Sequence, residues 1–474
     1  MAAREDVSAP WRLSAAAMGE AFRRRDTTPL EQLAVVRARI ERLNPRLNAI
    51  VAFDPAADEA ARASTARHAA GEALGPLDGV PFVVKDNILA RGMPCVWGSR
   101  VYRDFVPADD ELPVARLRAA GAVVIGKTNV PELTFEGITW NPVFGATRNP
   151  YDLALTPGGS SGGTVASVAA GIVPFGLGTD GGGSIRRPAS HTGLVGLKPS
   201  IGAVPRVNSL PMMLHDLEVV GPIARSVGDV ALAYRAMAGP DPRDRRSLFA
   251  AATPRSTPPG HARVLYVERF GDAPLDPQIA RSCAQAARAL ESAGCRVEAG
   301  PMPLRLEALN EFWPHFGAAG VAYVMSMHPG RESLLGPRFQ AMLEQGRQVS
   351  AARYLAGLEL FDTLRRESAA LFERYDFVMT PAAAALPWPA EEPYPTSIDG
   401  REVGPRGHAV YTGWVNACGI PAIALPCAPS REGLPIGFQL AAGFAQDESL
   451  LALAARYEAL APWRDRWPAL ATGT

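Results

Sequence analysis

Apolar and polar positions along the chain follow two periods, one typical of amphipathic helices and one typical of buried strands. The helical period predicts two helices within residues 11–45, and the second begins at Thr28-Pro29, a capping residue followed by proline, and ends near Leu43. The other elements that the pattern predicts are a surface helix over 55–70, helices over 108–120 and 278–293, a mostly helical region over 304–376, and strands over 48–53, 79–85, 122–125, 172–178, 219–223, 264–267, 295–298, 377–380 and 422–426.

The alternation of strand, helix and strand with continuous apolar runs indicates βαβ units. A Pro/Arg-rich segment at 240–260 interrupts the alternation, but strand, helix and strand resume directly after it. We therefore predict an α/β fold with a single large mixed β-sheet covered by helices on both faces. In this fold 240–260 is a surface crossing, and residues 1–474 form one domain.

The central stretch of the chain is an apolar run, Val165–Gly178, between two clusters of glycine and serine at 157–163 and 178–184. Glycine/serine clusters are usually loops or linkers. Here, however, the run between them predicts a buried helix leading into a strand, so the glycines are embedded in a core. Glycine lets other atoms approach the backbone closely, and serine supplies a nucleophile, a combination suited to acyl transfer with an oxyanion hole.

The composition is that of an ordinary globular protein, with 47% hydrophobic and 20% charged residues in 474. Lys+Arg and Asp+Glu are both 48, so nothing in the charge favours nucleic acid or an acidic membrane as a partner. The five cysteines form no CxxC pair, and no run reaches the roughly 18 apolar residues of a membrane span. The polar N-terminal residues lack the apolar core of a signal peptide, so we expect a cytoplasmic protein without a metal ion or other cofactor.

Two motifs match well-known patterns in letters only. Gly121–Thr128 fits the phosphate-binding G-x-x-x-x-G-K-[ST] pattern, but its central Ala-Val-Val-Ile is strand-forming and Pro131 follows too soon for a helix. Gly158–Gly162 fits the G-x-S-x-G nucleophile elbow, but the residues before it form a poor strand. The histidines share no sequence context that would identify a partner for a catalytic serine.

Serine chemistry without histidine requires another base, and Lys85 ends an apolar strand. Burial disfavours the ammonium form of lysine, lowers its pKa and yields an amine that can accept a proton. The alternative is that Lys85 lies in solvent at the strand end, as most such lysines do.

Six blocks together resemble the amidase signature family, from about residue 12 to residue 460. The blocks lie in the order that is typical of the family: Gly79–Asn87 (GVPFVVKDN), Gly126–Asn129 (GKTN), Gly145–Pro150 (GATRNP), Pro157–Gly163 (PGGSSGG), Gly178–Arg186 (GTDGGGSIR) and Gly193–Pro199 (GLVGLKP).

The resemblance implies an α/β/α sandwich with a Ser–cisSer–Lys triad. In it Ser184 is the nucleophile, Ser160 the bridging serine after a cis peptide bond, and Lys85 the base. The N–H groups of Gly181, Gly182 and Gly183, with that of Ser184, are implied to form the oxyanion hole. Ser161, Asp180 and Arg186 are implied to support the two glycine loops. The implied segments are an N-terminal helical part over 1–70, a core with the family motifs over 79–225, and a helical region over 300–376 that covers the pocket.

The substrate class implied is a small-molecule amide, anilide or carbamate with a hydrophobic part, or an ester, since apolar side chains favour such groups. As pocket residues we predict Met212, Met213, Phe316 and Trp414. Hydrolysis of an aryl carbamate would make the protein a urethanase. The sequence leaves a homodimer open.

The motifs are also similar to those of glutamine-dependent amidotransferase A subunits, which act with a partner protein. That branch is expected to hold the glutamine carboxylate and amine with an arginine and an aspartate. Here the matching positions are Asp362 and Ala409, so both charges are missing or reversed. A stand-alone amide hydrolase is therefore the leading hypothesis, and an amidotransferase component is the alternative.

Overall fold

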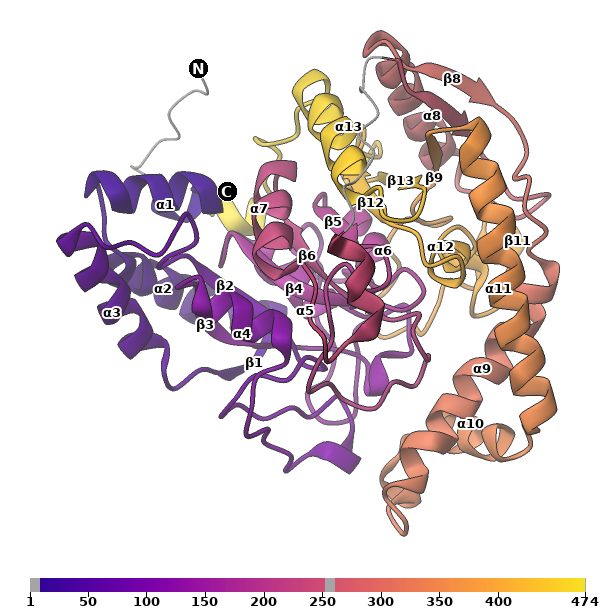
Figure 1. The fold of residues 1–474 in the computed structure, drawn as a ribbon, viewed down its shortest axis with the longest axis horizontal. Helices are drawn as coiled ribbons and strands as arrows, with labels where there is room; N and C mark the ends of the chain where they lie inside the picture. Colours follow the sequence, from indigo (N-terminus) through magenta and orange to yellow (C-terminus); the bar gives the residue numbers. More distant parts are fainter. Residues whose placement is uncertain (1–8, 252–260, 474) are drawn as a thin grey trace.

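Eleven strands form one mixed sheet in the computed structural model, which describes residues 9–251 and 261–473 (Figure 1). A two-stranded hairpin of β10 (Ser397–Ile398) and β11 (Arg401–Glu402) lies outside it. From one edge to the other, the strands of the large sheet are β1 (Ile50–Phe53), β3 (Val123–Thr128), β2 (Pro81–Lys85), β4 (Phe175–Asp180), β6 (Val219–Ala224), β5 (Val195–Lys198), β12 (Ala422–Pro426), β13 (Gly437–Ala442), β9 (Phe377–Pro381), β7 (Arg263–Tyr266) and β8 (Arg296–Ala299).

Parallel pairing is confined to two parts of the sheet. β2 runs parallel to both β3 and β4, and β7 runs parallel to both β8 and β9. The strands from β4 through β6, β5, β12 and β13 to β9 pair antiparallel. Because β3, β2 and β4 are parallel, their carboxyl ends meet at the same edge of the sheet, which is where ligand sites form in parallel sheets.

Helices cover both faces of the sheet, as predicted. Successive strand residues face opposite layers: Phe82 and Val84 pack into one apolar cluster, and Val83 packs into another. The first layer contains α1 (Ala15–Arg24), α4 (Leu112–Ala119), α7 (Val227–Met237), α8 (Pro277–Ser292) and α13 (Asp447–Leu460). The second contains α2 (Pro29–Leu47), α3 (Ala57–Ala70), α5 (Gly162–Ala169), α6 (Arg186–His191), α9 (Glu307–Ser326), α11 (Ala351–Arg374) and α12 (Gly413–Ala417).

Most predicted elements are present, with shifted ends. The second helix extends past Pro45 to Leu47, because Leu43 and Leu47 are both anchored in the core. The helix predicted over 108–120 begins only at Leu112, since Pro113 fits a first turn but not a helix interior. The helical region over 304–376 consists of α9, α10 (Pro337–Arg347) and α11. In the surface crossing over 240–260, a 3₁₀ helix spans Arg245–Ala251, and residues 252–260 lie outside the described residues.

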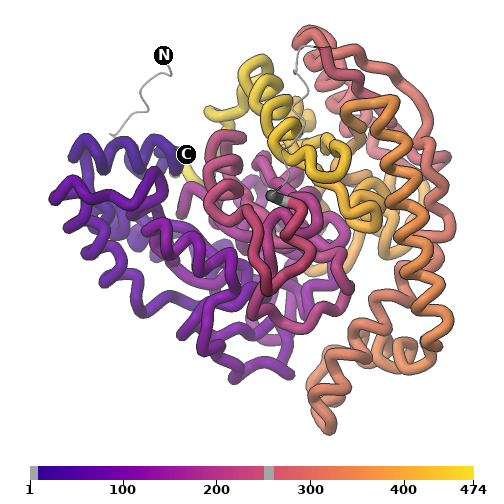
Figure 2. Tube along the Cα trace, viewed as in Figure 1, coloured from indigo at the N-terminus to yellow at the C-terminus, as the bar shows by residue number. Residues whose placement is uncertain are grey.

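The two ends of the described chain meet beside α1 and α2, on the side of the molecule opposite α9–α11 (Figure 2). The rings of Trp11 and Trp467 have centroids 4.8 Å apart. Arg39 donates a hydrogen bond to the carbonyl of Ala471 in the short C-terminal helix α14 (Ala469–Thr472). Within the described residues, no helix is long and apolar enough to cross a membrane.

The stacked pair Phe82–Phe175 provides a test of the core. The rings come from paired positions of β2 and β4 and lie 5.2 Å apart, and both are fully buried. Phe175→Ala should lower the free energy of unfolding by about 3–5 kcal/mol, because it removes apolar burial and leaves a cavity. The matched control is Phe53→Ala in β1, whose ring is 54% exposed, and should change stability by no more than about 0.5 kcal/mol. Chemical denaturation measures both free energies of unfolding, and equal losses in the two variants would contradict this account of the core.

Candidate active site

The predicted catalytic residues come together at the carboxyl ends of β2 and β4. Lys85 is the last residue of β2, and Ser184 lies in the turn between β4 and α6. Ser160 lies in the loop before α5, and the Gly159–Ser160 peptide bond is cis, as the resemblance implies. Residues far apart in the chain therefore meet because parallel strands end at a common edge.

Lys85 is completely buried, and its ammonium group contacts neutral oxygens. Nζ donates to Ser160 Oγ at 2.8 Å, and it lies 2.8 Å from Oγ1 and 3.2 Å from the carbonyl oxygen of Thr179. Burial lowers the pKa of Lys85 from 10.5 to about 7, although the negative charges of Glu218 and Asp180 oppose the shift. A substantial fraction of Lys85 is thus a neutral amine near pH 7, in hydrogen-bond contact with Ser160.

Close backbone contacts explain why glycine occupies position 159. A Cβ atom added to Gly159 would lie 2.2 Å from the carbonyl oxygen of Ile138. A side chain there would push the backbone of the loop away from its neighbour and move Ser160 with it. The glycine therefore allows this loop to approach the backbone of residues 136–138 closely.

Asp180 organises the turn that carries Ser184. Its carboxylate accepts hydrogen bonds from the N–H groups of Gly183 at 2.7 Å and Ile185 at 3.1 Å, and from Arg186 Nη2 at 2.8 Å. Burial raises the pKa of Asp180, but the charge and hydrogen bonds of Arg186, the hydrogen bond of Asn416 and the charge of Lys198 together outweigh it, and the pKa falls well below its usual range. Asp180 therefore stays ionised and holds the turn in one conformation.

This arrangement corrects one detail of the implied oxyanion hole. The N–H group of Gly183 is already bonded to Asp180, so it is not available to a substrate oxygen. In the part of the chain that the structure describes, the N–H groups of Gly181, Gly182 and Ser184 have no acceptor. These three donors, rather than that of Gly183, can face a developing oxyanion.

The same ion pair connects the turn to the C-terminal part of the chain. Arg186 also donates to Asn416 Oδ1 at 2.5 Å and to Gln439 Oε1 at 2.9 Å, residues of α12 and β13. Asn416 Nδ2 donates in turn to the carbonyl of Asp180 at 2.9 Å. Ser161 contributes a backbone N–H to the carbonyl of Ser184 at 3.2 Å.

A cavity of about 770 Å³ opens beside Ser184. Met212 and Met213 line it, as predicted. Phe316 and Trp414 do not: both are buried in the apolar cluster that packs behind the cavity, at 0% and 1% exposure. Their position corrects the sequence prediction, and the aromatic side chains that do line the cavity are those of Trp97, Phe135 and Trp313.

Other sequence hypotheses can be placed directly. The run that matches the phosphate-binding pattern contains the buried strand β3, and Lys127 Nζ donates to backbone carbonyls, one of them that of Asp86 at 3.0 Å. Asp362 is exposed on α11 and does not line the cavity, whereas Ala409 does. Position 362 therefore does not set the charge of the cavity.

Sequence reasoning missed three polar residues of the site: Thr179, Asn416 and Gln439. Thr179 immediately precedes Asp180 and supplies two of the oxygens around Lys85 Nζ. Its place inside a glycine block was the only signal for it. Asn416 and Gln439 lie more than two hundred residues further along the chain, in ordinary apolar contexts.

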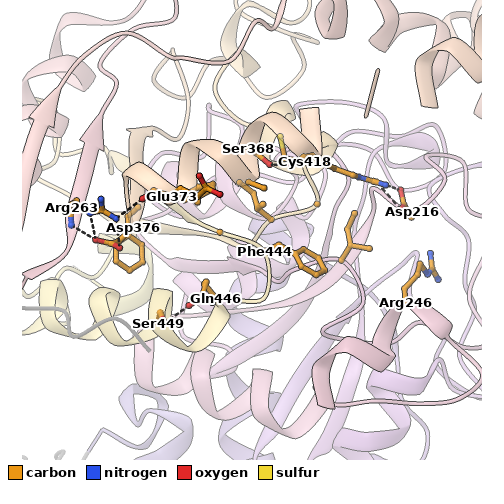
Figure 3. A pocket seen from close by; sticks show the side chains of 18 residues that line it. Asp216, Arg246, Arg263, Ser368, Glu373, Asp376, Cys418, Phe444, Gln446 and Ser449 are labelled. Atoms are coloured by element: carbon orange, nitrogen blue, oxygen red, sulfur yellow. Dashed lines mark hydrogen bonds and ion pairs between the residues drawn. The ribbon is translucent and has the colours of Figure 1, made fainter. Parts of the chain in front are cut away.

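A second cavity, of about 920 Å³, is lined in part by residues of α11 and by none of Lys85, Ser160 and Ser184 (Figure 3). Its arginines are paired with acids: Arg365 with Asp216 at 2.9 Å and Arg263 with Asp376 at 3.4 Å. None of the predicted site residues lines it.

Comparisons with known proteins find relatives over most of the chain. The family model described as amidase matches residues 31–451. Among curated proteins, the chain is 36% identical over 455 residues to the A subunit of the glutamyl-tRNA(Gln) amidotransferase of Synechococcus sp. (strain CC9605), covering 89% of this chain and 90% of that protein. It is 32% identical over 471 residues to an acylamidase of Rhodococcus erythropolis, covering 96% and 97% of the two chains.

Solved structures match over nearly the full length. A bacterial aryl acylamidase of the amidase signature enzymes aligns with a TM-score of 0.88 and 29% identity, covering 98% of this chain and 99% of that one. A 6-aminohexanoate cyclic dimer hydrolase aligns with a TM-score of 0.87 and 29% identity, covering 97% and 99%. The chain therefore belongs to the amidase signature family and is an enzyme that acts on carbon–nitrogen bonds.

Proposed function

We propose that the chain hydrolyses small-molecule amides through a covalent intermediate on Ser184. The observation that carries this proposal is the 2.8 Å hydrogen bond between the buried Lys85 Nζ and Ser160 Oγ. A lysine with a pKa of about 7 can act as a general base at neutral pH. Serine chemistry requires such a base, and in the described residues Ser184 makes no hydrogen bond to a histidine.

In the proposed first half-reaction, neutral Lys85 takes the proton of Ser160, and Ser160 takes that of Ser184. Ser184 Oγ forms a bond to the amide carbonyl carbon, and negative charge develops on the carbonyl oxygen. The free N–H groups of Gly181 and Gly182, together with that of Ser184, stabilise this oxyanion. Preorganised donors of this kind supply much of the rate enhancement in acyl transfer.

The intermediate collapses when its C–N bond breaks. Ser160 returns a proton to the leaving nitrogen, which departs as an amine and leaves an ester on Ser184. Water then adds to that ester, with Lys85 and Ser160 again accepting the proton. Release of the carboxylic acid restores the Ser184 hydroxyl.

The lining of the cavity supports a substrate with a hydrophobic part. Its apolar side chains include those of Trp97, Phe135, Met212, Met213, Leu214, Trp313 and Met342. Methionine and tryptophan side chains adapt to flat or irregular apolar groups. We propose an amide, anilide or carbamate as the substrate class, with esters accepted by the same tetrahedral chemistry.

A second candidate function is that of an amidotransferase A subunit, which requires a partner. The observation in its favour is similarity to such proteins, for example 34% identity over 97% of this chain to that of Moorella thermoacetica. The uncharged Ala409 in the cavity argues against a site for the ammonium group of glutamine.

Turnover by the purified chain alone distinguishes the two functions. We expect release of 4-nitroaniline from an acyl 4-nitroanilide and no release of ammonia from L-glutamine. Glutamine turnover, together with inactivity toward aryl amides and aryl carbamates, would favour the amidotransferase function instead.

Ser184→Ala should lower kcat/KM by about 10⁴-fold or more, since the nucleophile is lost while binding remains. The matched control is Ser167→Ala, which removes a buried serine of α5 whose Oγ donates to the carbonyl of Gly163 at 2.8 Å. The control should retain turnover close to that of the natural chain. Retained hydrolysis by purified, folded Ser184→Ala protein would show that the nucleophile is another residue.

The pH dependence follows from the lowered pKa of Lys85. Only the neutral amine accepts a proton, so kcat/KM should rise about tenfold per pH unit below pH 7 and level off above it. The measurement is a profile of kcat/KM from pH 5 to 10 with a substrate that does not titrate in this range. A rise that continues to pH 10 would indicate a lysine with its ordinary pKa of 10.5 and would contradict the buried base.

A further inference from the structure

The charged residues of the cavity beside Ser184 are unevenly paired. The lining includes three arginines and two glutamates. Glu136 accepts from Arg338 at 2.6 Å, and Glu218 accepts at 2.7 Å from Arg206, which lies outside the lining. Both acidic side chains are therefore paired, although Glu218 shares Arg206 with Glu111, and two arginines of the cavity have no carboxylate partner among the described residues.

The first of these arginines, Arg187, is used within the protein. It is 7% exposed, and its Nη1 donates to Thr412 Oγ1 at 3.0 Å and to the carbonyl of Gly182. Arg187 thus holds the glycine turn against the segment before α12. Both contacts use Nη1, and Nε is buried without a hydrogen-bond partner.

The second, Arg406, has no such role. It is half-buried, and its guanidinium carbon lies 4.8 Å from the centroid of the Trp313 ring. Neither a hydrogen bond nor an ion pair of its guanidinium is present within residues 9–251 and 261–473, and burial alone lowers its pKa to about 10. A stacked guanidinium keeps its N–H groups free at the edge of its plane.

Arg406 is also close to the catalytic turn. A Cβ atom added to Gly182 would lie 2.9 Å from Cζ2 of Trp313, so Gly182 and Arg406 both contact this one ring. The neighbouring His408 lines the same cavity, and both of its ring nitrogens are buried without a hydrogen-bond partner. Burial lowers the pKa of His408 most, and the charges of Arg187 and Arg406 lower it further, which indicates an electropositive cavity.

In the second cavity of the molecule, arginine side chains of the lining are paired with carboxylates. Arg365 and Arg263 line it, and each forms an ion pair with an aspartate (Figure 3). A partly buried guanidinium without an anion is costly, because water is removed from it and nothing replaces the water. Arg406 is therefore the charged group of this cavity that calls for an external partner.

We propose that Arg406 binds a carboxylate of the substrate, so that the amide cleaved at Ser184 carries a negative charge away from its scissile bond. This inference rests on the proposed hydrolase function and adds the substrate class. The planar guanidinium can hold a carboxylate with two parallel N–H···O bonds. The apolar lining then contacts the hydrocarbon or aryl part between the carboxylate and the amide. The carboxylate lies on either the acyl or the amine side of the substrate, and the test has one arm for each.

The test is a binding measurement with Ser184→Ala protein, which is expected to hold an amide without cleaving it. The acyl-side pair is the 4-nitroanilide of glutaric acid and its methyl ester; the amine-side pair is 4-butanamidobenzoic acid and its methyl ester. Calorimetry should show that the acid of one pair binds about 10- to 100-fold more tightly than its ester. Adding Arg406→Gln should reduce that preference to within about threefold. Arg406→Lys in the same Ser184→Ala protein should keep part of the preference for the acid, because lysine supplies the positive charge but not the two parallel N–H donors of the guanidinium.

The matched control is Arg347→Gln, which removes one positive charge on α10 outside the cavity, where Arg347 pairs with Glu344 at 2.7 Å. It should leave the preference unchanged. If neither acid binds more tightly than its ester, or if neither acid binds at all, the inference is wrong, and it is equally wrong if the preference survives Arg406→Gln. Cleavage of the amide bond of the two methyl esters by the natural chain is a separate measurement. It shows whether the hydrolase function holds even when the carboxylate site does not.

Discussion

The buried ion pair between Asp180 and Arg186 is the interaction on which the site depends. Asp180 ends β4 and Arg186 begins α6, and the carboxylate holds the N–H groups of the turn between them. A single buried charge would be strongly unfavourable, but here each partner is also satisfied by hydrogen bonds from distant elements. The pair thereby converts a glycine-rich turn, which would otherwise be free to change shape, into a rigid support for Ser184.

The sheet edge supplies the second constraint. β2 and β4 are parallel neighbours, so Lys85 and Thr179 meet at their carboxyl ends, where Lys85 Nζ contacts Thr179 Oγ1. Burial in this layered core removes water from the lysine and lowers its pKa, and the oxygens around Nζ are neutral groups. The same packing that stabilises the fold therefore lowers the pKa of the lysine that we propose as the base.

Charge in the cavity is balanced differently from charge elsewhere in the protein. The acids of the lining are paired with arginines, and Arg187 binds the glycine turn, whereas Arg406 stacks on an indole ring without an anion. A substrate that completes this pairing would gain affinity from a group remote from the reacting bond. Such remote binding energy can position the scissile carbonyl against Ser184.

The sequence by itself determined the layered α/β fold, because apolar periodicity is a local signal that tertiary packing reinforces. That Lys85 meets the two glycine clusters was implied only by the resemblance of six sequence blocks to the amidase signature family. Only the tertiary structure decided that the N–H group of Gly183 is occupied and that Asn416 and Gln439 brace Arg186. It also decided that Trp313, and not Phe316, faces the cavity. An apolar helix such as α9 carries the same pattern whether a given ring packs into the core or lines a cavity, and a polar residue has no recognisable partner until the chain brings the two together.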